Sequence, residues 1–500
     1  MISQNKKYFD SCIITARALL KEGLYHDCIL YLNKLVSFAN NNFIGYYANW
    51  ELEELLNILG SKIIPDNSKN NIREKKKNDL SILHIVSEIY PTGGHTKLLF
   101  NWIELDEDNI HSVITTRMTI DALIDVSQKY PLNKKINYQE LQEKEFIAKI
   151  IELNQSVKNY DRIILHIHPD DIIPVIALSD KNIQTPVLFL NHADHLFWVG
   201  ISIVDCLVQI REINIILDKL RRKANFQKLL PIPIYNKKLE ISRSIKYTKK
   251  EGDLYLLSTG SEYKYKPYNG YDFFKAAYSI VEKYDNVHFF IAGVSDKSSL
   301  VQEYLHPRIY YLGNVLNLSE YEDICDIYVE GFPIPSFTAL LQVALKKKYI
   351  HLIYNPVNLF RLFNDNPKYD LVYSKSYDEW INSLEQVIES SATRERKMTN
   401  QYTYINSIYN IKNWIIMLND IYDSTKDIVH KIREKEDDTS YFTEDEELLS
   451  SLHKDVKYTH YAYCEKLSLY EKIKLVWRGK NKTKKILIGK LETLKFLINR

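Results

Sequence analysis

The chain has 500 residues, of which 45% are hydrophobic, and its 66 Lys and Arg residues nearly balance its 64 Asp and Glu residues. This length predicts two or three domains, and the hydrophobic content is sufficient to fill their cores. The balanced charge excludes a global electrostatic field that would draw the protein toward nucleic acid.

Cysteine usage and hydropathy predict a cytoplasmic protein. No run of eighteen apolar residues occurs, and charged residues interrupt the N-terminal segment, so we expect neither a membrane span nor a secretory signal. The five cysteines are scattered without a CxxC spacing, which argues against a disulfide framework and a cysteine zinc site. They are Cys12, Cys28, Cys206, Cys325 and Cys464.

The first part of the chain has a helical pattern. Residues 1–64 repeat apolar side chains at spacings of three and four, as in Cys28, Leu32 and Leu35. Residues 65–79 are rich in Asn and Lys and nearly free of apolar side chains, which is typical of a solvated linker. We therefore predict a helical N-terminal extension that ends in a linker.

Two series of short apolar segments follow, and helical stretches separate the segments. Such alternation predicts parallel sheets covered by helices on both faces. The expected fold class is α/β, with two Rossmann-like doubly wound domains at residues 80–235 and 250–422 that face a ligand-binding cleft. The predicted strands are 81–87, 111–116, 161–167, 186–191 and 205–210 in the first domain, and 254–259, 287–293, 308–313, 326–331 and 349–354 in the second.

Residues 423–500 form a predicted helical extension that ends in a basic segment from Lys472 onward. The interpretation that we favour is a helical domain with a solvated basic face. The alternative is a basic amphipathic surface that contacts anionic lipid, which would place the protein peripherally at the inner membrane face.

The first Rossmann-like half carries candidate ligand residues at its strand ends. A Gly-Gly turn lies before a predicted helix, where exposed amides favour an anion or a sugar oxygen, although such a turn alone is weak evidence. Two further strand ends bear HIHPDD and NHADHLFW, whose imidazoles and carboxylates suit sugar hydroxyls and proton handling. We assign Gly93, Gly94, His95, Thr96 and His168 to the acceptor side, and His192, Asp194 and His195 to catalysis.

The same residues have two other interpretations. The HxHxD and HxDH spacings contain zinc-ligand types, but both lie on predicted loops without a further ligand motif, so we predict no metal site. Alternatively, Asp170 and Asp194 are placed to cap helices, and we expect one of them to do so.

The second half offers a site for a diphosphate. Lys264 and Lys266 follow a strand end, and Ser336 and Thr338 begin a predicted helix whose amides and positive dipole end favour phosphate. The alternative for the lysines is a solvated surface. The candidate donor-binding residues are Gly260, Ser261, Lys264, Lys266, Gly293, Glu330, Pro335, Ser336, Phe337, Thr338 and Gln342.

The order of the motifs PTGGHTK, HIHPDD, NHADHLFWVG, GSEYKYKP and DIYVEGFPIPSFTALL resembles GT-B fold glycosyltransferases of the family 4 type, especially a bacterial group with an N-terminal helical extension. The resemblance covers about residues 80–420. It implies a retaining transfer from a nucleotide sugar held by the second half, an acceptor held by the first half, and no bound metal or cofactor.

The resemblance also implies roles for single residues. His192 matches the histidine that contacts the donor sugar, and Lys264 and Lys266 match the paired basic residues at the diphosphate, although the first of these is more often Arg. Glu330 lies near the first position of the family's pair of glutamates. Gln342 stands at the second, where a carboxylate binds the ribose; Gln can hydrogen-bond to ribose hydroxyls but carries no charge.

The leading hypothesis is therefore transfer of a hexose or N-acetylhexosamine from a UDP- or GDP-type donor to a glycan, lipid-linked or protein hydroxyl. A protein O-glycosyltransferase of an adhesin or flagellin is the alternative choice of acceptor. The degraded glutamate pair also leaves open a non-catalytic scaffold or partner subunit. The sequence does not address the oligomeric state.

Overall fold

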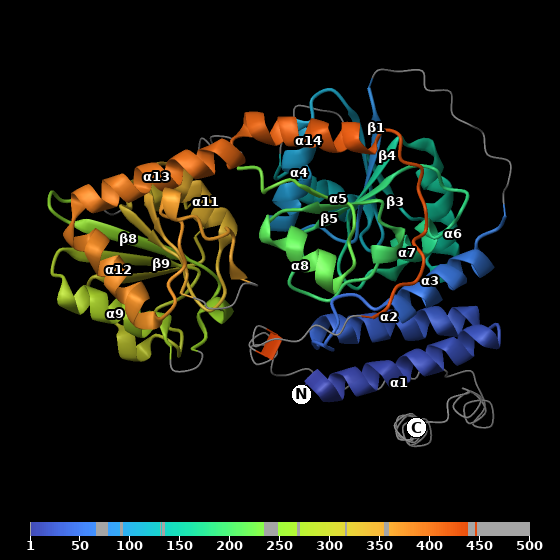
Figure 1. The fold of residues 1–500 in the computed structure, drawn as a ribbon, viewed down its shortest axis with the longest axis horizontal. Coiled ribbons are helices and arrows are strands. Elements are labelled where there is room, and N and C mark those ends of the chain that lie inside the picture. Colours follow the sequence, from blue (N-terminus) through green and yellow to red (C-terminus); the bar gives the residue numbers. More distant parts are fainter. Residues whose placement is uncertain are drawn as a thin grey trace. The chain divides into compact units, whose positions relative to one another are not determined.

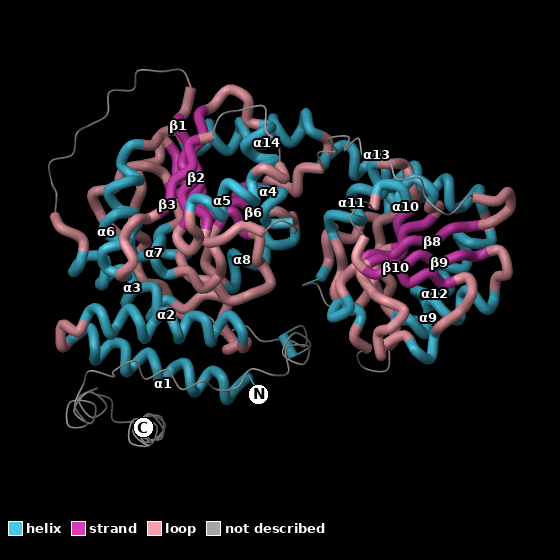
Figure 2. Tube along the Cα trace, turned by 180° about the vertical axis from the view of Figure 1, so that it is seen from behind, coloured by secondary structure: helices cyan, strands magenta, loops and turns pink. Residues whose placement is uncertain are grey.

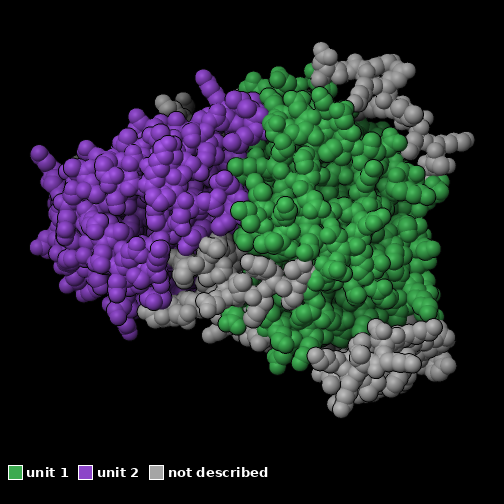
Figure 3. Space-filling view, in the orientation of Figure 1, with its two compact units in different colours: residues 1–210, 214–230, 418–500 green, residues 211–213, 231–417 purple. Residues whose placement is uncertain are grey.

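The structure is a computed structural model (Figure 1). It describes residues 2–66, 79–90, 94–130, 132, 136–234, 249–267, 271–315, 318–354, 360–438 and 446–447. The chain divides into two compact units (Figure 3). Unit 1 comprises residues 1–210, 214–230 and 418–500, and unit 2 comprises residues 211–213 and 231–417.

Unit 1 contains a parallel sheet with the strand order β3-β2-β1-β4-β5-β6-β7. The strands are β1 (Ser81–Val86), β2 (Ile110–Thr115), β3 (Asn137–Glu140), β4 (Arg162–His166), β5 (Val187–Asn191), β6 (Cys206–Gln209) and β7 (Gln227–Leu229). The connecting helices are α4 (Gly94–Leu105), α5 (Ile120–Ser127), α6 (Phe146–Ser156), α7 (Ile172–Leu178) and α8 (Ile213–Arg221). The central strands are buried along nearly their whole length, which is why they are continuous apolar runs in the sequence.

Unit 2 repeats this plan with a five-stranded parallel sheet of order β10-β9-β8-β11-β12 (Figure 2). Its strands are β8 (Leu254–Thr259), β9 (Val287–Ala292), β10 (Ile309–Gly313), β11 (Ile327–Val329) and β12 (Tyr349–His351). Its helices are α9 (Phe273–Lys283), α10 (Ser319–Ile324), α11 (Phe337–Leu345), α12 (Tyr377–Glu389) and α13 (Ser391–Tyr409). The prediction of two Rossmann-like doubly wound domains is confirmed.

The N-terminal helices α1 (Ile2–Lys21), α2 (Tyr25–Asn41) and α3 (Trp50–Ile63) share one hydrophobic core with the sheet of unit 1. Helix α3 packs on α7, and Gly60 allows this close approach because a Cβ there would lie 2.7 Å from the Ile176 carbonyl oxygen. The buried Glu53 carboxylate accepts hydrogen bonds from the amides of Gly200 and Ser202, at 2.7 and 3.1 Å, and from the Ser202 hydroxyl at 2.6 Å. The helices are therefore part of the domain and not an appendage.

The chain leaves unit 2 through α14 (Ile411–Thr425), of which the residues from Leu418 onward belong to unit 1. Residues 426–438 contain no helix or strand. Apart from Glu446 and Glu447, the predicted C-terminal extension beyond residue 438 lies outside the described residues, and so does its basic segment. Across the part of the chain that the structure describes, no helix is long and apolar enough to span a membrane.

The Glu53→Ala substitution tests how firmly the N-terminal helices are tied to the sheet domain. It leaves the buried amides of Gly200 and Ser202 without an acceptor, so we expect the free energy of unfolding to fall by about 2 kcal/mol. Urea denaturation monitored by tryptophan fluorescence measures this. The matched control is Glu51→Ala, since Glu51 lies on the same helix with its side chain 47% exposed. An equal effect of the two substitutions would contradict the role of Glu53.

Candidate functional site

Unit 1 gathers imidazoles beyond the carboxyl ends of β4 and β5. His166 is the last residue of β4 and His192 follows β5, while His95 lies in the first turn of α4. The rings of His95 and His192 are 4.3 Å apart, and those of His95 and His168 are 6.0 Å apart. The structure thus brings imidazoles of the HIHPDD and NHADHLFW segments, namely His166, His168 and His192, together with His95.

Burial keeps the imidazoles of His95, His166 and His192 uncharged. Desolvation lowers the pKa of His95 to about 4, while the Nε2 hydrogen bond to the His166 carbonyl oxygen, at 2.9 Å, opposes this shift only in part. The pKa values of His166 and His192 are lowered well below the usual value, first by burial and then by neighbouring imidazoles. Neutral imidazoles carry both a donor and an acceptor nitrogen, so this edge can hydrogen-bond to a polar ligand.

The other residues predicted for unit 1 lie around this cluster. Gly94 is the first residue of α4, and the Thr96 hydroxyl accepts a hydrogen bond from the Tyr90 amide at 2.9 Å. Thr96 therefore links the first turn of α4 to Tyr90. Gly93 lies outside the described residues.

Asp194 is held within the protein. Its carboxylate accepts a hydrogen bond from Asn214, and its carbonyl oxygen accepts from Arg221 and Arg222 at 2.8 and 3.0 Å. Both arginines are buried and pair with Asp218. The imidazole of His195, whose side chain is 40% exposed, lies 3.4 Å from the Asp194 carboxylate. This network fixes the loop after β5 and hence the position of His192.

The expectation that Asp170 or Asp194 caps a helix is wrong for the helix after HIHPDD. Asp171 is the N-cap of α7, because its carboxylate accepts from the Ile173 amide at 3.2 Å. Asp170 instead forms an ion pair with Arg117 at 3.0 Å. Asp171 caps the helix in place of Asp170 because only Asp171 immediately precedes the first turn.

Unit 2 places a lysine at the start of α11. The Lys264 ammonium donates to the Pro335 carbonyl oxygen at 3.0 Å and to the Ser336 hydroxyl at 3.1 Å. Ser336 directly precedes α11, but its side chain caps none of the helix amides. The first-turn amides of a helix have no intrahelical partners, so these amides and one ammonium group point to the same place. An anion such as a phosphate suits this arrangement.

Glu330 lies beside this lysine at the carboxyl end of β11. One carboxyl oxygen, Oε2, accepts from the Ile353 amide at 2.7 Å, while Oε1 is buried without a hydrogen-bond partner. Burial raises the pKa of Glu330 to about 8, although the Ile353 amide and Lys264 both act in the opposite direction. Desolvation also lowers the pKa of Lys264. The site therefore holds a largely neutral carboxyl group with one oxygen available to a ligand.

Glycines shape the edge of the sheet around Tyr265, whose ring is 1% exposed. Gly293 has φ of 93°, and a Cβ there would lie 2.3 Å from the Gly260 carbonyl oxygen, so only glycine fits. A Cβ at Gly331 would lie 2.4 Å from the Tyr265 ring. Tyr265 and Gly331 are missing from the sequence-based assignment, because an aromatic residue between two lysines has no distinctive pattern.

The remaining donor-site candidates differ in how exposed they are. Ser261 and Lys266 are exposed, whereas Phe337, Thr338 and Gln342 are partly buried on the helix. The Arg211 guanidinium lies over the Phe337 ring at 5.0 Å and donates to the Arg361 carbonyl oxygen at 2.7 Å. Arg211 is another residue that the sequence did not indicate, because it is distant in the chain from the helix that it contacts.

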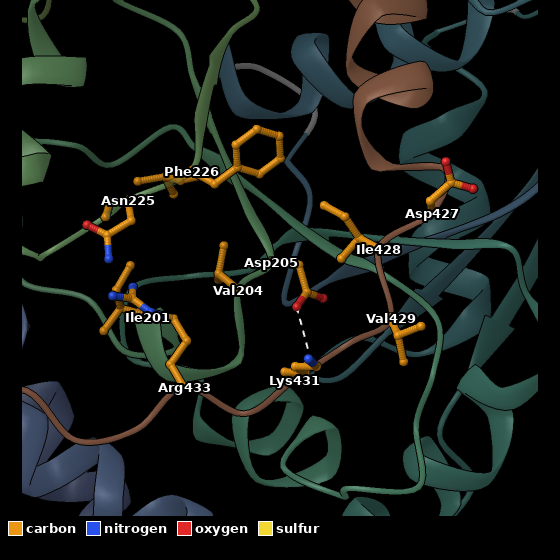
Figure 4. Close-up of a pocket in the computed structure, with 12 residues that line it drawn as sticks. Ile201, Val204, Asp205, Asn225, Phe226, Asp427, Ile428, Val429, Lys431 and Arg433 are labelled. Atoms are coloured by element: carbon orange, nitrogen blue, oxygen red, sulfur yellow. Dashed lines mark hydrogen bonds between the residues drawn. The ribbon is translucent and has the colours of Figure 1, made fainter.

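A separate groove lies in unit 1 near the amino ends of β6 and β7 (Figure 4). Its apolar lining includes Val204, Phe226 and Ile428, and the Lys431 amide donates to Asp205 at 3.2 Å. This groove is at the opposite end of the strands from the imidazole cluster. Within the described ranges, no group of three or more His, Cys, Asp or Glu side chains is arranged to hold a metal ion.

Solved structures share this architecture. A variant of the Thermobaculum terrenum O-GlcNAc transferase is 10% identical, with a TM-score of 0.50 over 83% of this chain and 82% of that one. The chain adopts the GT-B fold. A TarM variant from S. aureus, in complex with fondaparinux, alpha-GlcNAc-glycerol and UDP, is 10% identical, with a TM-score of 0.50 over 69% of this chain and 100% of that one. A glycosyltransferase from Rickettsia africae is 9% identical, with a TM-score of 0.50 over 70% of this chain and 99% of that one.

The likeness is confined to the fold. No protein-family model matches the sequence, and no curated protein is significantly similar to it.

The buried carboxyl group of Glu330 makes the stability of the protein depend on pH. The folded pKa of about 8 exceeds the ordinary value of 4.5, so between these values the native state retains a proton that the unfolded chain has lost. The free energy of unfolding of the wild type, relative to that of Glu330→Gln, should therefore fall as the pH rises from 5 to 8, by up to about 1.4 kcal/mol per pH unit. The comparison cancels the contribution of the buried histidines, whose lowered pKa values act on stability in the opposite direction.

Urea midpoints of the wild type and the Glu330→Gln variant at pH 5, 6, 7 and 8 measure the effect. Glu262→Gln serves as the control, because Glu262 is exposed in the same unit. If the wild type and Glu330→Gln change in parallel with pH, Glu330 is ionised in the folded protein and the account of its burial is wrong.

Proposed function

We propose that the protein is a glycosyltransferase that moves a hexose or N-acetylhexosamine from a UDP- or GDP-type nucleotide sugar to a glycan, lipid-linked or protein hydroxyl. Unit 2 binds the donor and unit 1 binds the acceptor. The observation that carries the proposal is the convergence of Lys264, the first turn of α11 and the buried Glu330 carboxyl group. Together they offer cationic and amide donors to a diphosphate and a polar oxygen to a sugar hydroxyl.

The donor site suggests how the leaving group is stabilised. Negative charge develops on the nucleoside diphosphate as the glycosidic bond breaks, and a fixed ammonium and helix amides lower the energy of that charge. Lys264 is held in place by Pro335 and Ser336, so little reorganisation is needed. We therefore propose transfer without a metal ion or other cofactor, and Lys266 supplies further positive charge from its exposed position.

We also propose contacts for the ribose and for the sugar of the donor. Glu330 and Gln342 are proposed to bind ribose hydroxyls, and His192 the donor sugar. The resemblance of the sequence motifs to glycosyltransferases of the family 4 type supports retention of configuration. UDP is our first choice of nucleotide, because the TarM structure with the same fold contains UDP.

The N-terminal helices α1, α2 and α3 do not favour a protein acceptor over a glycan or lipid-linked acceptor. Its helices bury their apolar side chains in the core of unit 1, so they are explained by packing without a polypeptide ligand. Deleting them would expose that core, and the deletion therefore cannot serve as a test of acceptor choice.

Isothermal titration with UDP in EDTA tests the donor site. We expect the wild type to bind UDP and Lys264→Ala to bind it about tenfold to a hundredfold more weakly, since a charge-assisted hydrogen bond contributes about 1.5 to 3 kcal/mol. Lys266→Ala should cause a smaller loss. Lys275→Ala is the matched control, because Lys275 is exposed on α9 of the same unit.

Unchanged affinity in Lys264→Ala would refute the phosphate site. Failure of the wild type to bind UDP, GDP and ADP would favour a non-catalytic scaffold over an enzyme.

A further inference from the structure

Three buried imidazoles form a hydrogen-bonded row across the sheet of unit 1. His84 Nε2 lies 2.9 Å from His111 Nδ1, and His84 Nδ1 lies 3.0 Å from His166 Nε2. The row runs obliquely over β2, β1 and β4, because Ile82 is the partner of His111 and Val86 is the partner of His166. It therefore joins the amino end of β2 to the carboxyl end of β4, where the cluster of His95 and His192 lies.

The far end of the row faces a carboxylate. His111 Nε2 lies 3.3 Å from the Asp106 carbonyl oxygen and 3.4 Å from its Oδ2. The same carboxylate accepts from the Tyr422 hydroxyl at 2.6 Å and from the Asn109 amide nitrogen at 2.7 Å. The Tyr422 hydroxyl in turn accepts from Trp102 Nε1 at 3.0 Å, which leaves its own proton for Asp106.

These acceptors determine which nitrogen of each imidazole carries the proton. A carbonyl or carboxylate oxygen only accepts, so His111 donates through Nε2 and, when neutral, accepts through Nδ1. His84 must then donate through Nε2 to His111 and accept through Nδ1, and His166 must donate through Nε2 to His84. This order of donors leaves His166 Nδ1 without a proton, so that it can only accept. This buried atom has no hydrogen-bond partner.

The neighbouring imidazoles of His95 and His192 each have one nitrogen without a proton as well. His95 donates through Nε2 to the His166 carbonyl oxygen at 2.9 Å, which leaves Nδ1 as its acceptor. His192 donates through Nδ1 to the Leu190 carbonyl oxygen at 3.3 Å, which leaves Nε2 as its acceptor. Three acceptor nitrogens therefore belong to one cluster at the carboxyl edge of the sheet.

The surroundings keep His84 and His166 of this row uncharged. Burial lowers the pKa of His84 well below its usual value, and the imidazoles of His166 and His111 lower it further. The Trp102 ring packs edge-on against His84 and His166, at 6.0 and 5.8 Å between centroids. Asp106 faces the His111 end of the row, and the buried Arg162 donates to the Tyr422 carbonyl oxygen at 3.2 Å.

We propose that Asp106, His111 and His84 are positioning residues that hold His166 as a hydrogen-bond acceptor, and that His166, His95 and His192 form a recognition site for a ligand that presents several hydroxyl groups. The inference rests on the proposed function in identifying that ligand: the donor sugar lies at His192, and the acceptor, a neutral sugar or polyol, lies at His95 and His166. Hydroxyl groups donate to bare imidazole nitrogens, whereas an anionic group such as a phosphate finds only lone pairs at these atoms.

Nitrogen-15 NMR of the full-length protein labelled at histidine tests the proposal, because the shift of each ring nitrogen shows whether it carries a proton. At pH 7.5 we expect His84, His111, His166 and His95 to carry the proton on Nε2, and His192 on Nδ1. Single substitutions assign the resonances. A proton on His166 Nδ1 would overturn the proposed order of donors.

A titration with methyl α-D-glucopyranoside to 100 mM tests the ligand class in the same samples. We expect the acceptor nitrogens of His95, His166 and His192 to shift, and His166→Gln to raise the dissociation constant about tenfold, since it removes one hydrogen bond to a buried acceptor. His306→Gln, in unit 2, should have no effect.

If the sugar leaves all three nitrogens unshifted, the hydroxyl site is refuted. Adding UDP to a separate sample tests the proposed function independently, because the donor-site residues lie in unit 2. A protein that fails to bind UDP but shows the expected protonation pattern and sugar shifts would retain this site and lose the assignment as a glycosyltransferase.

Discussion

Both sheets are parallel and covered by helices, so a polar side chain on them must find a partner in the interior or lie past a strand end. Glu330 in unit 2 and His166 in unit 1 each occupy such a strand end, and each has one buried atom without a hydrogen-bond partner. A native protein rarely leaves such atoms unpaired unless a ligand, an ion or water completes them. The two atoms mark the same edge of each sheet at which doubly wound folds bind ligands.

The two sites use this edge differently. In unit 2, the ammonium of Lys264 and the first turn of α11 provide positive charge, and the carboxyl group of Glu330 is largely neutral because it is buried. In unit 1, neutral imidazoles provide acceptors, and the row that starts at Asp106 orients His166. A charged diphosphate suits the first site, and an uncharged polyol suits the second.

The sequence predicted much of the fold, because strands buried on both faces are continuous apolar runs. The strands β3 and β7 were missed, since NYQE and QKL are short, polar and only partly buried at the sheet edges. The helical pattern of residues 1–64 was recognised, but periodicity does not show what a helix packs against, so its place in the core of unit 1 was not predicted.

The candidate sites were predicted where residues close in the chain share a strand end. HIHPDD, NHADHLFW and GSEYKYKP are such segments, and the contacts of Lys264 with Pro335 and Ser336 join two of the predicted donor segments. His84 and His111 were not singled out, because a lone histidine in an apolar strand is usually a core residue. Their role depends on strand register, which brings residues far apart in the sequence into one row.

A crystal structure of the protein with UDP is the most direct test of the central claim. The account predicts that the diphosphate lies against the first turn of α11, with the Lys264 ammonium within hydrogen-bond distance of a phosphate oxygen and Glu330 Oε1 facing a ribose hydroxyl. UDP bound away from α11, with Lys264 still held only by Pro335 and Ser336, would contradict it.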